Sequence, residues 1–352
     1  MKNIKKFCSA LCIIILFVGY GKFFHYILVD DTSSYTRLTM HELYHAESNI
    51  DVLFVGSSHV YRSLNPEITD HIFGLNTFNA GTSSQGMDGS LAVIKETAAY
   101  HNLSQIYLDV YFGIALMEPN KDRSQLTQTY IISDYMKPSI RKIKYLLQAS
   151  AKDYYVNGFI PARRDWEKLF DLAYIFDLVK KKQTDNYKNY KWTKNKNDTE
   201  YYVTKGYVAN ETVMQENAYS DEKTDTTIDL TSISDDWKKS LQDIIDFCKK
   251  ERIQLTLFST PMSESFLIKN GNYGDYSRMI QNIADQADIS YYDFNLCKPE
   301  YFSNRTTDYF YDEHHLNAKG AEIFSNVFSK FFTGQISEKD LFYESFEEKI
   351  LN

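Results

Sequence analysis

Two parts of the chain alternate short apolar runs with stretches in which apolar residues recur at helical spacing. The apolar runs cover residues 51–56, 77–81, 105–110, 253–258 and 289–294. Helical spacing covers 86–100, 276–287 and 317–332, and cap-type residues at 234–236 open a further helix. Short apolar runs separated by helices are typical of strands buried in a parallel sheet. The pattern therefore predicts an α/β fold with a doubly wound parallel sheet.

Residues between the two parts interrupt this rhythm. Helical patterns cover 140–147 and 165–179, whereas 180–225 is rich in Lys, Asn, Asp, Thr and Tyr with little periodicity. We expect a helical and irregular insertion over one edge of the sheet, dominated by loops. The sequence predicts five units in chain order. They are an N-terminal segment (1–30), the first part of the sheet domain (31–118), the insertion (119–233), the second part of the domain (234–335) and a docked helical tail (336–352).

The first thirty residues resemble a membrane segment. Three lysines precede an apolar run over 7–20, and a second apolar stretch over 23–29 follows Lys22. The first run alone is shorter than the roughly 20 residues that span a bilayer, so Lys22 has to snorkel to an interface. A cleaved signal peptide and a buried N-terminal helix are the alternatives to an uncleaved anchor. We favour the anchor, which predicts a single-pass protein of the cell membrane with an extracytoplasmic catalytic domain.

Composition narrows the function classes. The chain has 352 residues, a net charge of −8 and 15% aromatic residues, so wholesale disorder is excluded and nucleic acid is a poor partner. The four cysteines include no Cys-x-x-Cys pair, which argues against a thiolate zinc site. Adjacent histidines such as His314 and His315 point apart on most backbones. The sequence therefore predicts no metal site and no cofactor.

Candidate chemistry stands at two ends of the sequence. Ser58 follows the first strand within Gly-Ser-Ser-His, where a tight turn exposes a hydroxyl and the next helix presents backbone N–H groups. His59 is expected to point away from this site as a structural residue. Near the last helix, Asp312 stands three residues ahead of His315. A carboxylate at this spacing can orient an imidazole that takes a proton from a serine.

Together these blocks resemble the SGNH/GDSL hydrolase superfamily. The resemblance implies a flavodoxin-like sheet, Ser58 as nucleophile, His315 as general base and Asp312 as its orienting carboxylate. It also implies that the backbone N–H groups of Ser58 and Gly81 form an oxyanion hole, because Asn-Ala-Gly at 79–81 matches the second block.

The third block of the family departs from its pattern here. The usual Gly-x-Asn-Asp follows the third strand, but this chain has no asparagine over 108–113. Ser84 and Gln85 are the nearest candidates to replace the missing oxyanion donor, and Asp109 is a possible pocket residue. The loss of one such donor costs about 3 kcal/mol in the transition state, so a slow or inactive site is the other outcome.

The missing asparagine and the predicted anchor resemble the envelope acyltransferases of teichoic-acid D-alanylation in layout. This resemblance implies a serine O-acyltransferase or esterase that acts on cell-envelope polysaccharide or teichoic acid. A multi-span membrane-bound O-acyltransferase is then the expected partner that supplies acyl groups. The alternative is a catalytically decayed SGNH-fold protein that binds or scaffolds the envelope.

Overall fold

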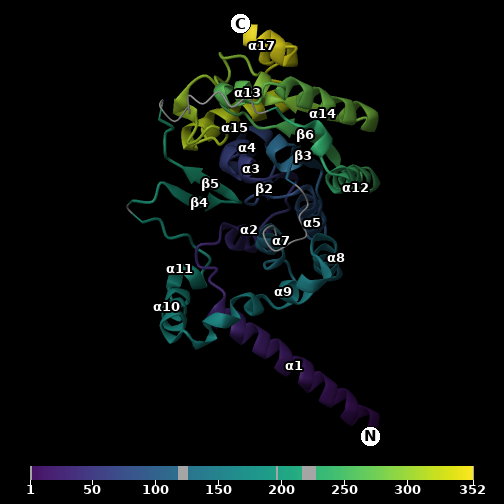
Figure 1. Ribbon diagram of the computed structural model, residues 1–352, viewed down its shortest axis with the longest axis vertical. Coiled ribbons are helices and arrows are strands. Elements are labelled where there is room, and N and C mark those ends of the chain that lie inside the picture. The colour runs from purple at the N-terminus through teal and green to yellow at the C-terminus, as the bar shows by residue number, and fades with distance from the viewer. Residues whose placement is uncertain (1, 118–125, 196, 216–226, 352) are drawn as a thin grey trace.

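A five-stranded parallel sheet forms the centre of the molecule in the computed structural model, which describes residues 2–117, 126–195, 197–215 and 227–351 (Figure 1). The strand order is β2-β1-β3-β6-β7, and every neighbouring pair is parallel. The strands are β1 (Val52–Val55), β2 (Thr77–Asn79), β3 (Gln105–Asp109), β6 (Gln254–Ser259) and β7 (Ser290–Asp293). This is the flavodoxin-like order, and the predicted α/β sheet is confirmed.

Alternate side chains of the strands pack into two separate apolar clusters. On β1, Leu53 and Val55 join the cluster under one set of helices, whereas Val52 and Phe54 face the other set. The first set is α2 (Tyr35–Tyr44), α5 (Met87–Thr97), α12 (Asp235–Glu251) and α14 (Tyr273–Ala287). The opposite face carries α3 (Ser58–Ser63), α4 (Pro66–Phe73) and α15 (Ala318–Phe332). Because both faces are covered, all four residues of β1 are apolar and buried.

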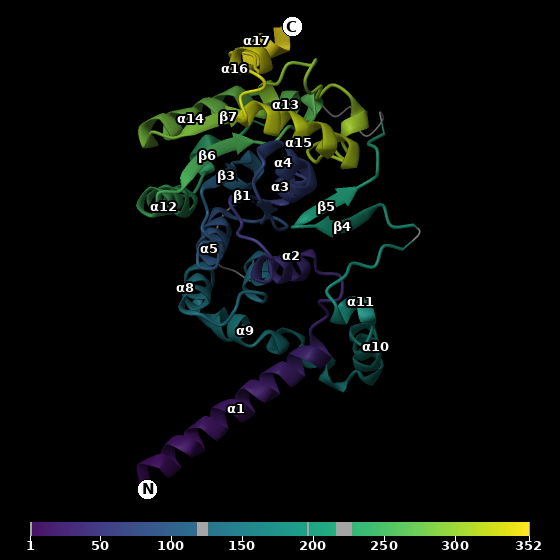
Figure 2. The same cartoon turned by 180° about the vertical axis from the view of Figure 1, so that it is seen from behind.

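The insertion contains more regular structure than its composition predicts. Its helical part comprises α7 (Leu126–Ser133), α8 (Ile140–Ala149), α9 (Tyr155–Phe159), the 3₁₀ segment Pro161–Phe170, α10 (Leu172–Lys182) and α11 (Asp185–Lys188). An antiparallel hairpin, β4 (Glu200–Thr204) and β5 (Tyr207–Asn210), lies where loops are expected, next to α3 (Figure 2). Lys205 and Gly206 form its turn with positive φ angles of 46° and 82°. The predicted boundary at 118/119 lies outside the described residues.

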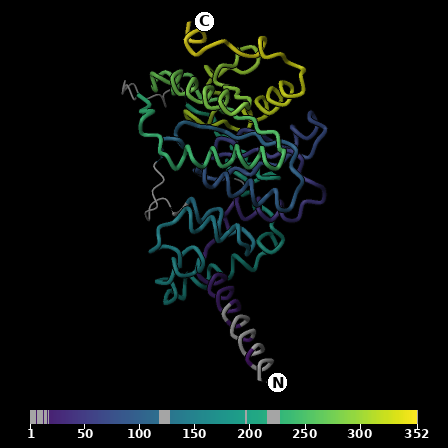
Figure 3. Tube along the Cα trace, turned by 90° about the vertical axis from the view of Figure 1, so that its right-hand side faces the viewer, coloured from purple at the N-terminus to yellow at the C-terminus, as the bar shows by residue number. Residues whose placement is uncertain are grey.

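The predicted membrane anchor is wrong. Helix α1 (Lys2–Leu28) projects from the end of the body that carries α10 (Figures 1 and 3). Among the helices of the described residues, none combines the length and the apolar character that crossing a bilayer requires. Lysines at the start of α1 and Lys22 near its end interrupt the apolar sequence. Its last turn packs into the insertion instead, since Leu28 is fully buried and its carbonyl accepts the Tyr174 hydroxyl at 2.8 Å. The predictions of a single-pass location and an extracytoplasmic domain depended on this anchor and are contradicted with it.

The ends of the sheet domain differ from the sequence prediction in detail. In place of one terminal helix, the tail has two short ones, α16 (Glu338–Leu341) and α17 (Phe346–Leu351). Leu341 is fully buried, so the tail is docked as expected. Two more short helices, α6 (Phe112–Ala115) and α13 (Glu264–Lys269), follow β3 and β6 directly. They surround the carboxyl edge of the sheet, where doubly wound folds bind their ligands.

Candidate functional site

The turn after β1 places Ser58 at the reversal point of the strand order. Ser58 is the first residue of α3, so its backbone N–H has no acceptor within the helix. Ser57 caps the helix by accepting the His59 N–H. Gly56 is required because a Cβ there would lie 2.5 Å from Val60 Cγ2 and 2.8 Å from Asp109 Cβ. The turn is therefore tight enough to present the hydroxyl between the ends of β1 and β3.

The structure brings Ser58, His315 and Asp312 into one chain of hydrogen bonds. Ser58 Oγ lies 2.8 Å from His315 Nε2, although 257 residues separate them in sequence. On the other side of the ring, His315 Nδ1 lies 2.9 Å from Asp312 Oδ2. With the proton on Nδ1, the imidazole donates to the carboxylate and accepts from the serine hydroxyl. This is the arrangement in which a histidine can remove a serine proton.

A short loop holds the Asp312 and His315 side chains together. An isolated antiparallel bridge between Phe310 and Leu316 closes the loop. Within it, Asp312 Oδ1 accepts the backbone N–H groups of His314 and His315 at 3.0 and 2.8 Å. Burial opposes the charge on Asp312, but the hydrogen bond and charge of His315, with these backbone donors, hold the pKa of that carboxyl well below its usual range. Asp312 is therefore ionised at neutral pH beside His315.

Gly81 lies against the Ser58 turn, but its N–H already has an acceptor. The Gly81 N–H donates to Asn79 Oδ1 at 3.1 Å. A Cβ on Gly81 would lie 2.9 Å from the Ser57 carbonyl oxygen, so glycine is needed for this close approach. Asn79 also donates through Nδ2 to the Val60 carbonyl of α3. Of the two predicted oxyanion donors, the Ser58 N–H is therefore more available than the Gly81 N–H. Asn79 connects Gly81 to α3, the helix that Ser58 begins.

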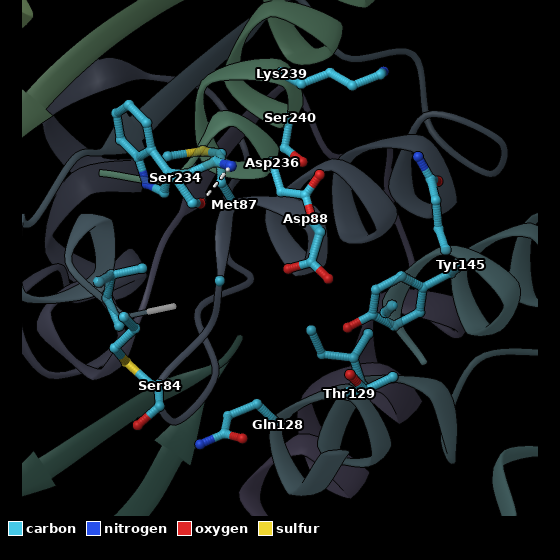
Figure 4. A pocket seen from close by; sticks show the side chains of 17 residues that line it. Ser84, Met87, Asp88, Gln128, Thr129, Tyr145, Ser234, Asp236, Lys239 and Ser240 are labelled. Carbon is cyan, nitrogen blue, oxygen red and sulfur yellow. Dashed lines mark hydrogen bonds between the residues drawn. The ribbon is translucent and has the colours of Figure 1, made fainter. Parts of the chain in front are cut away.

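Ser84 and Gln85 occupy different places in the loop after β2. Ser84 adopts a positive φ of 48° and lines a cavity of about 290 Å³, together with Met87 and Asp88 (Figure 4). The Gln85 side chain is buried and committed to the loop itself. Its Oε1 accepts the Thr82 hydroxyl at 2.9 Å, and its Nε2 donates to Ser90 at 3.1 Å. The Gln85 side chain therefore stabilises the loop, and the described residues show no hydrogen bond between it and Ser58.

Asp109 lies buried at the end of β3, behind the serine turn. Its Oδ1 accepts the backbone N–H and the hydroxyl of Thr260 at 3.0 and 2.9 Å. Its Oδ2 has no hydrogen-bond partner among the described residues. Burial raises the pKa of Asp109 to about 7, although the Thr260 donors act in the opposite direction. Asp109 and Ser57 line the same small cavity, so Asp109 is a neighbour of the site rather than a member of the hydrogen-bonded chain.

Two residues near the histidine are absent from the sequence prediction. The Tyr311 hydroxyl lies 3.0 Å from His315 Nδ1. Arg62 lies over the Tyr311 ring at 4.7 Å and pairs with Glu200 of the hairpin at 2.6 Å. The position of Arg62, four residues after Ser58 on a helix, is the only sequence signal that places it on the same face. Its contact with Glu200 connects the insertion to the site.

His59 does not point away from the site, in contrast to the sequence prediction. Its ring centre lies 4.7 Å from that of His315 and 3.7 Å from that of Tyr111, on which it stacks. The rings of His314 and His315 also lie close, at 4.3 Å. Burial, with His315 and His314 nearby, lowers the pKa of His59 well below its usual value, and burial with His315 lowers the pKa of His314 to about 4. Both rings are therefore neutral at pH 7.

Comparison with known proteins gives only distant likeness. No family model matches the chain, and no curated protein matches it. One of the solved structures that match is a "putative acylhydrolase" from Bacteroides fragilis. It is 9% identical, with a TM-score of 0.35, and the match covers 84% of this chain and 94% of that chain. A likeness this distant says nothing about chemistry, so the function proposed below rests on the geometry of the site.

Proposed function

We propose that this protein is a serine-dependent acyl-transfer enzyme of the SGNH type. The observation that carries the proposal is the continuous hydrogen-bonded chain from Ser58 through His315 to Asp312. Its supporting context is the placement of Ser58 at a helix N-terminus, on the carboxyl edge of a parallel sheet. The sequence block that contains Ser58 and the block that contains Asp312 and His315 are each weak signals. They lie within the hydrogen-bond distances that proton transfer from the serine requires.

The reaction proceeds through an acyl-serine. Ser58 Oγ attacks the carbonyl carbon of an acyl donor while His315 Nε2 takes the hydroxyl proton, and the oxyanion forms beside the Ser58 N–H. The leaving group departs with the proton that His315 returns. Water or an acceptor hydroxyl then attacks the acyl-serine, and its proton passes through His315 back to Ser58. The products are a carboxylic acid or a new ester, respectively, together with the free enzyme.

The proposal leaves the acceptor and the partner protein unnamed, in contrast to the sequence prediction. The envelope polymer and the membrane-bound donor protein both depend on the predicted anchor, which the structure contradicts. The proposal therefore names neither, and its donor is a carboxylic ester. The Gly81 N–H contributes to the oxyanion hole only by sharing its proton with Asn79 Oδ1.

The test compares Ser58→Ala with Ser63→Ala on an aryl acetate. Ser63 lies at the end of the same helix, and within the described residues its hydroxyl donates to the His59 carbonyl alone, so it is a matched control for helix stability. We expect kcat/KM to fall by about 10⁴-fold or more in Ser58→Ala, and to change little in Ser63→Ala. A serine-directed phosphonate should label the wild-type chain on the peptide that contains Ser58. Equal activity of both variants, without labelling, contradicts the proposal. A wild type that neither hydrolyses the ester nor reacts with the phosphonate favours the non-catalytic binding alternative.

A further inference from the structure

Three imidazoles from two separate elements meet beside Ser58. His59 belongs to α3, whereas His314 and His315 lie in the loop before α15. Each ring offers one nitrogen, and the three nitrogens all lie within 4.8 Å of one another. The acyl-transfer chemistry uses only His315. The other two rings therefore need a separate explanation.

His59 is the unusual member of this cluster. Its side chain is 2% exposed, and neither ring nitrogen has a hydrogen-bond partner among the described residues. An unpaired buried polar group costs about 1–3 kcal/mol, so native proteins satisfy nearly all of them. A bound ion is one of the few ways to satisfy such a group. The ring is also fixed in place, since it stacks on Tyr111 at 3.7 Å.

The donor set suits a transition metal. Neutral imidazoles prefer zinc, copper and nickel over magnesium or calcium, which take oxygen ligands. A cation centred among nitrogens no more than 4.8 Å apart lies within about 2.8 Å of all three, so bonds of about 2.0–2.1 Å require the rings to close by less than 1 Å. The His314 side chain is 34% exposed and provides access from solvent. Asp312, which accepts from His315 Nδ1, is the outer-shell carboxylate typical of such ligands.

We propose that His59, His314 and His315 form a binding site for a divalent cation of the zinc class, and that the bound cation switches off the serine chemistry. His315 Nδ1 is engaged by Asp312, so Nε2 is the nitrogen that faces the cation. That nitrogen has one lone pair, which accepts the Ser58 hydroxyl at 2.8 Å in the metal-free chain. Metal binding and proton removal from Ser58 are mutually exclusive uses of this lone pair. Inhibition rests on the proposed function, whereas binding of the metal does not.

The binding test uses cobalt(II) alone, added to metal-free protein and followed by visible absorption. We expect one equivalent to bind, with displacement by zinc. His59→Gln and His314→Gln should each weaken binding by about tenfold or more. His71→Gln changes an exposed histidine of α4 outside the cluster, and this variant should bind as tightly as wild type. His59 is buried, so His59→Gln can misfold. If it does, His314→Gln decides the result, because the His314 side chain is one-third exposed.

The functional test adds micromolar zinc to the ester assay. We expect the wild type to lose at least nine-tenths of its activity and to regain it with EDTA, whereas His314→Gln should lose a much smaller fraction of its own zinc-free activity in the same zinc. Ser58→Ala should bind cobalt like the wild type, which separates the metal site from the proposed reaction. The metal site is refuted if the wild type shows no stoichiometric binding, or if both histidine variants bind with full affinity.

Discussion

The hairpin of the insertion packs directly against Asn79 at the end of β2, two residues before Gly81, and Gly206 makes this contact possible. The backbone of Asn79 donates to the Lys205 carbonyl at 2.9 Å. Gly206 has a φ of 82°, and a Cβ there would lie only 1.7 Å from the Asn79 carbonyl oxygen. We predict that Gly206→Ala forces the hairpin away from the sheet and displaces Asn79 from its place beside α3.

The magnitude follows from a comparison with a glycine in open space. Gly74 has a φ of 64°, and a Cβ added to it would meet no atom within 4 Å, so Gly74→Ala carries only the backbone penalty of roughly 1–2 kcal/mol. Gly206→Ala carries the same penalty, and its Cβ and the Asn79 oxygen must also separate by roughly 1.5 Å or more to reach van der Waals contact. That movement breaks the Lys205 hydrogen bond, worth about 1 kcal/mol, and loosens the hairpin. We expect a total loss of about 3 kcal/mol or more.

Urea unfolding and ester hydrolysis measure the two consequences separately. The free energy of unfolding should fall by about 2 kcal/mol more in Gly206→Ala than in Gly74→Ala. Because Asn79 holds both the Gly81 N–H and the Val60 carbonyl, kcat/KM should fall at least tenfold in Gly206→Ala alone. Equal losses of stability in the two variants would refute the reasoning, since the clash with Asn79 would then have no cost.

Two further predictions concern buried polar side chains. The pKa of Asp109 is raised to about 7 from its ordinary 3.8, so the folded chain keeps a proton that the unfolded chain releases. The stability that Asp109 contributes is therefore present at low pH and is lost as pH rises towards 7. The free energy of unfolding in urea should thus be lower at pH 7.5 than at pH 4.5, and Asp109→Asn should remove this difference. The same pH dependence in wild type and Asp109→Asn would count against the raised pKa. Asn317 caps α15 through Gly320 and donates to the Asp308 and Phe310 carbonyls, so Asn317→Ala should cost about 2–4 kcal/mol. Asn317→Ser should recover about 1 kcal/mol through its capping oxygen, and an unchanged urea midpoint in Asn317→Ala would contradict this.

Local patterns were sufficient for the sheet and its nearest chemistry. Each of the five apolar runs forms a strand, because a continuous apolar segment of this length can be buried only between two helical layers. Ser234 caps α12 as its sequence context predicts. The same reasoning failed for β4 and β5, since these strands are only five and four residues long and too short to show a clear alternation of apolar and polar residues.

The N-terminal helix shows where apolar character misleads. A run of apolar residues has the same composition whether it enters a bilayer or ends against a protein surface. The apolar run predicted a membrane helix here, but the burial of Leu28 depends on the insertion more than a hundred residues away. Lys22 interrupts the apolar run and is a local signal against a membrane-spanning helix. The structure agrees with this signal.

The sequence by itself determined the five strands of the central sheet and several of the helices that cover it, the residue types Ser58, Asp312 and His315, and the glycines that tight turns require. These are local properties, set by periodicity, capping and the conformational freedom of single residues. Only the tertiary structure decided that Ser58 and His315 lie 2.8 Å apart and that His59 turns towards the other histidines. Each of these depends on contacts between distant segments, and their free energies arise from packing that no local pattern encodes.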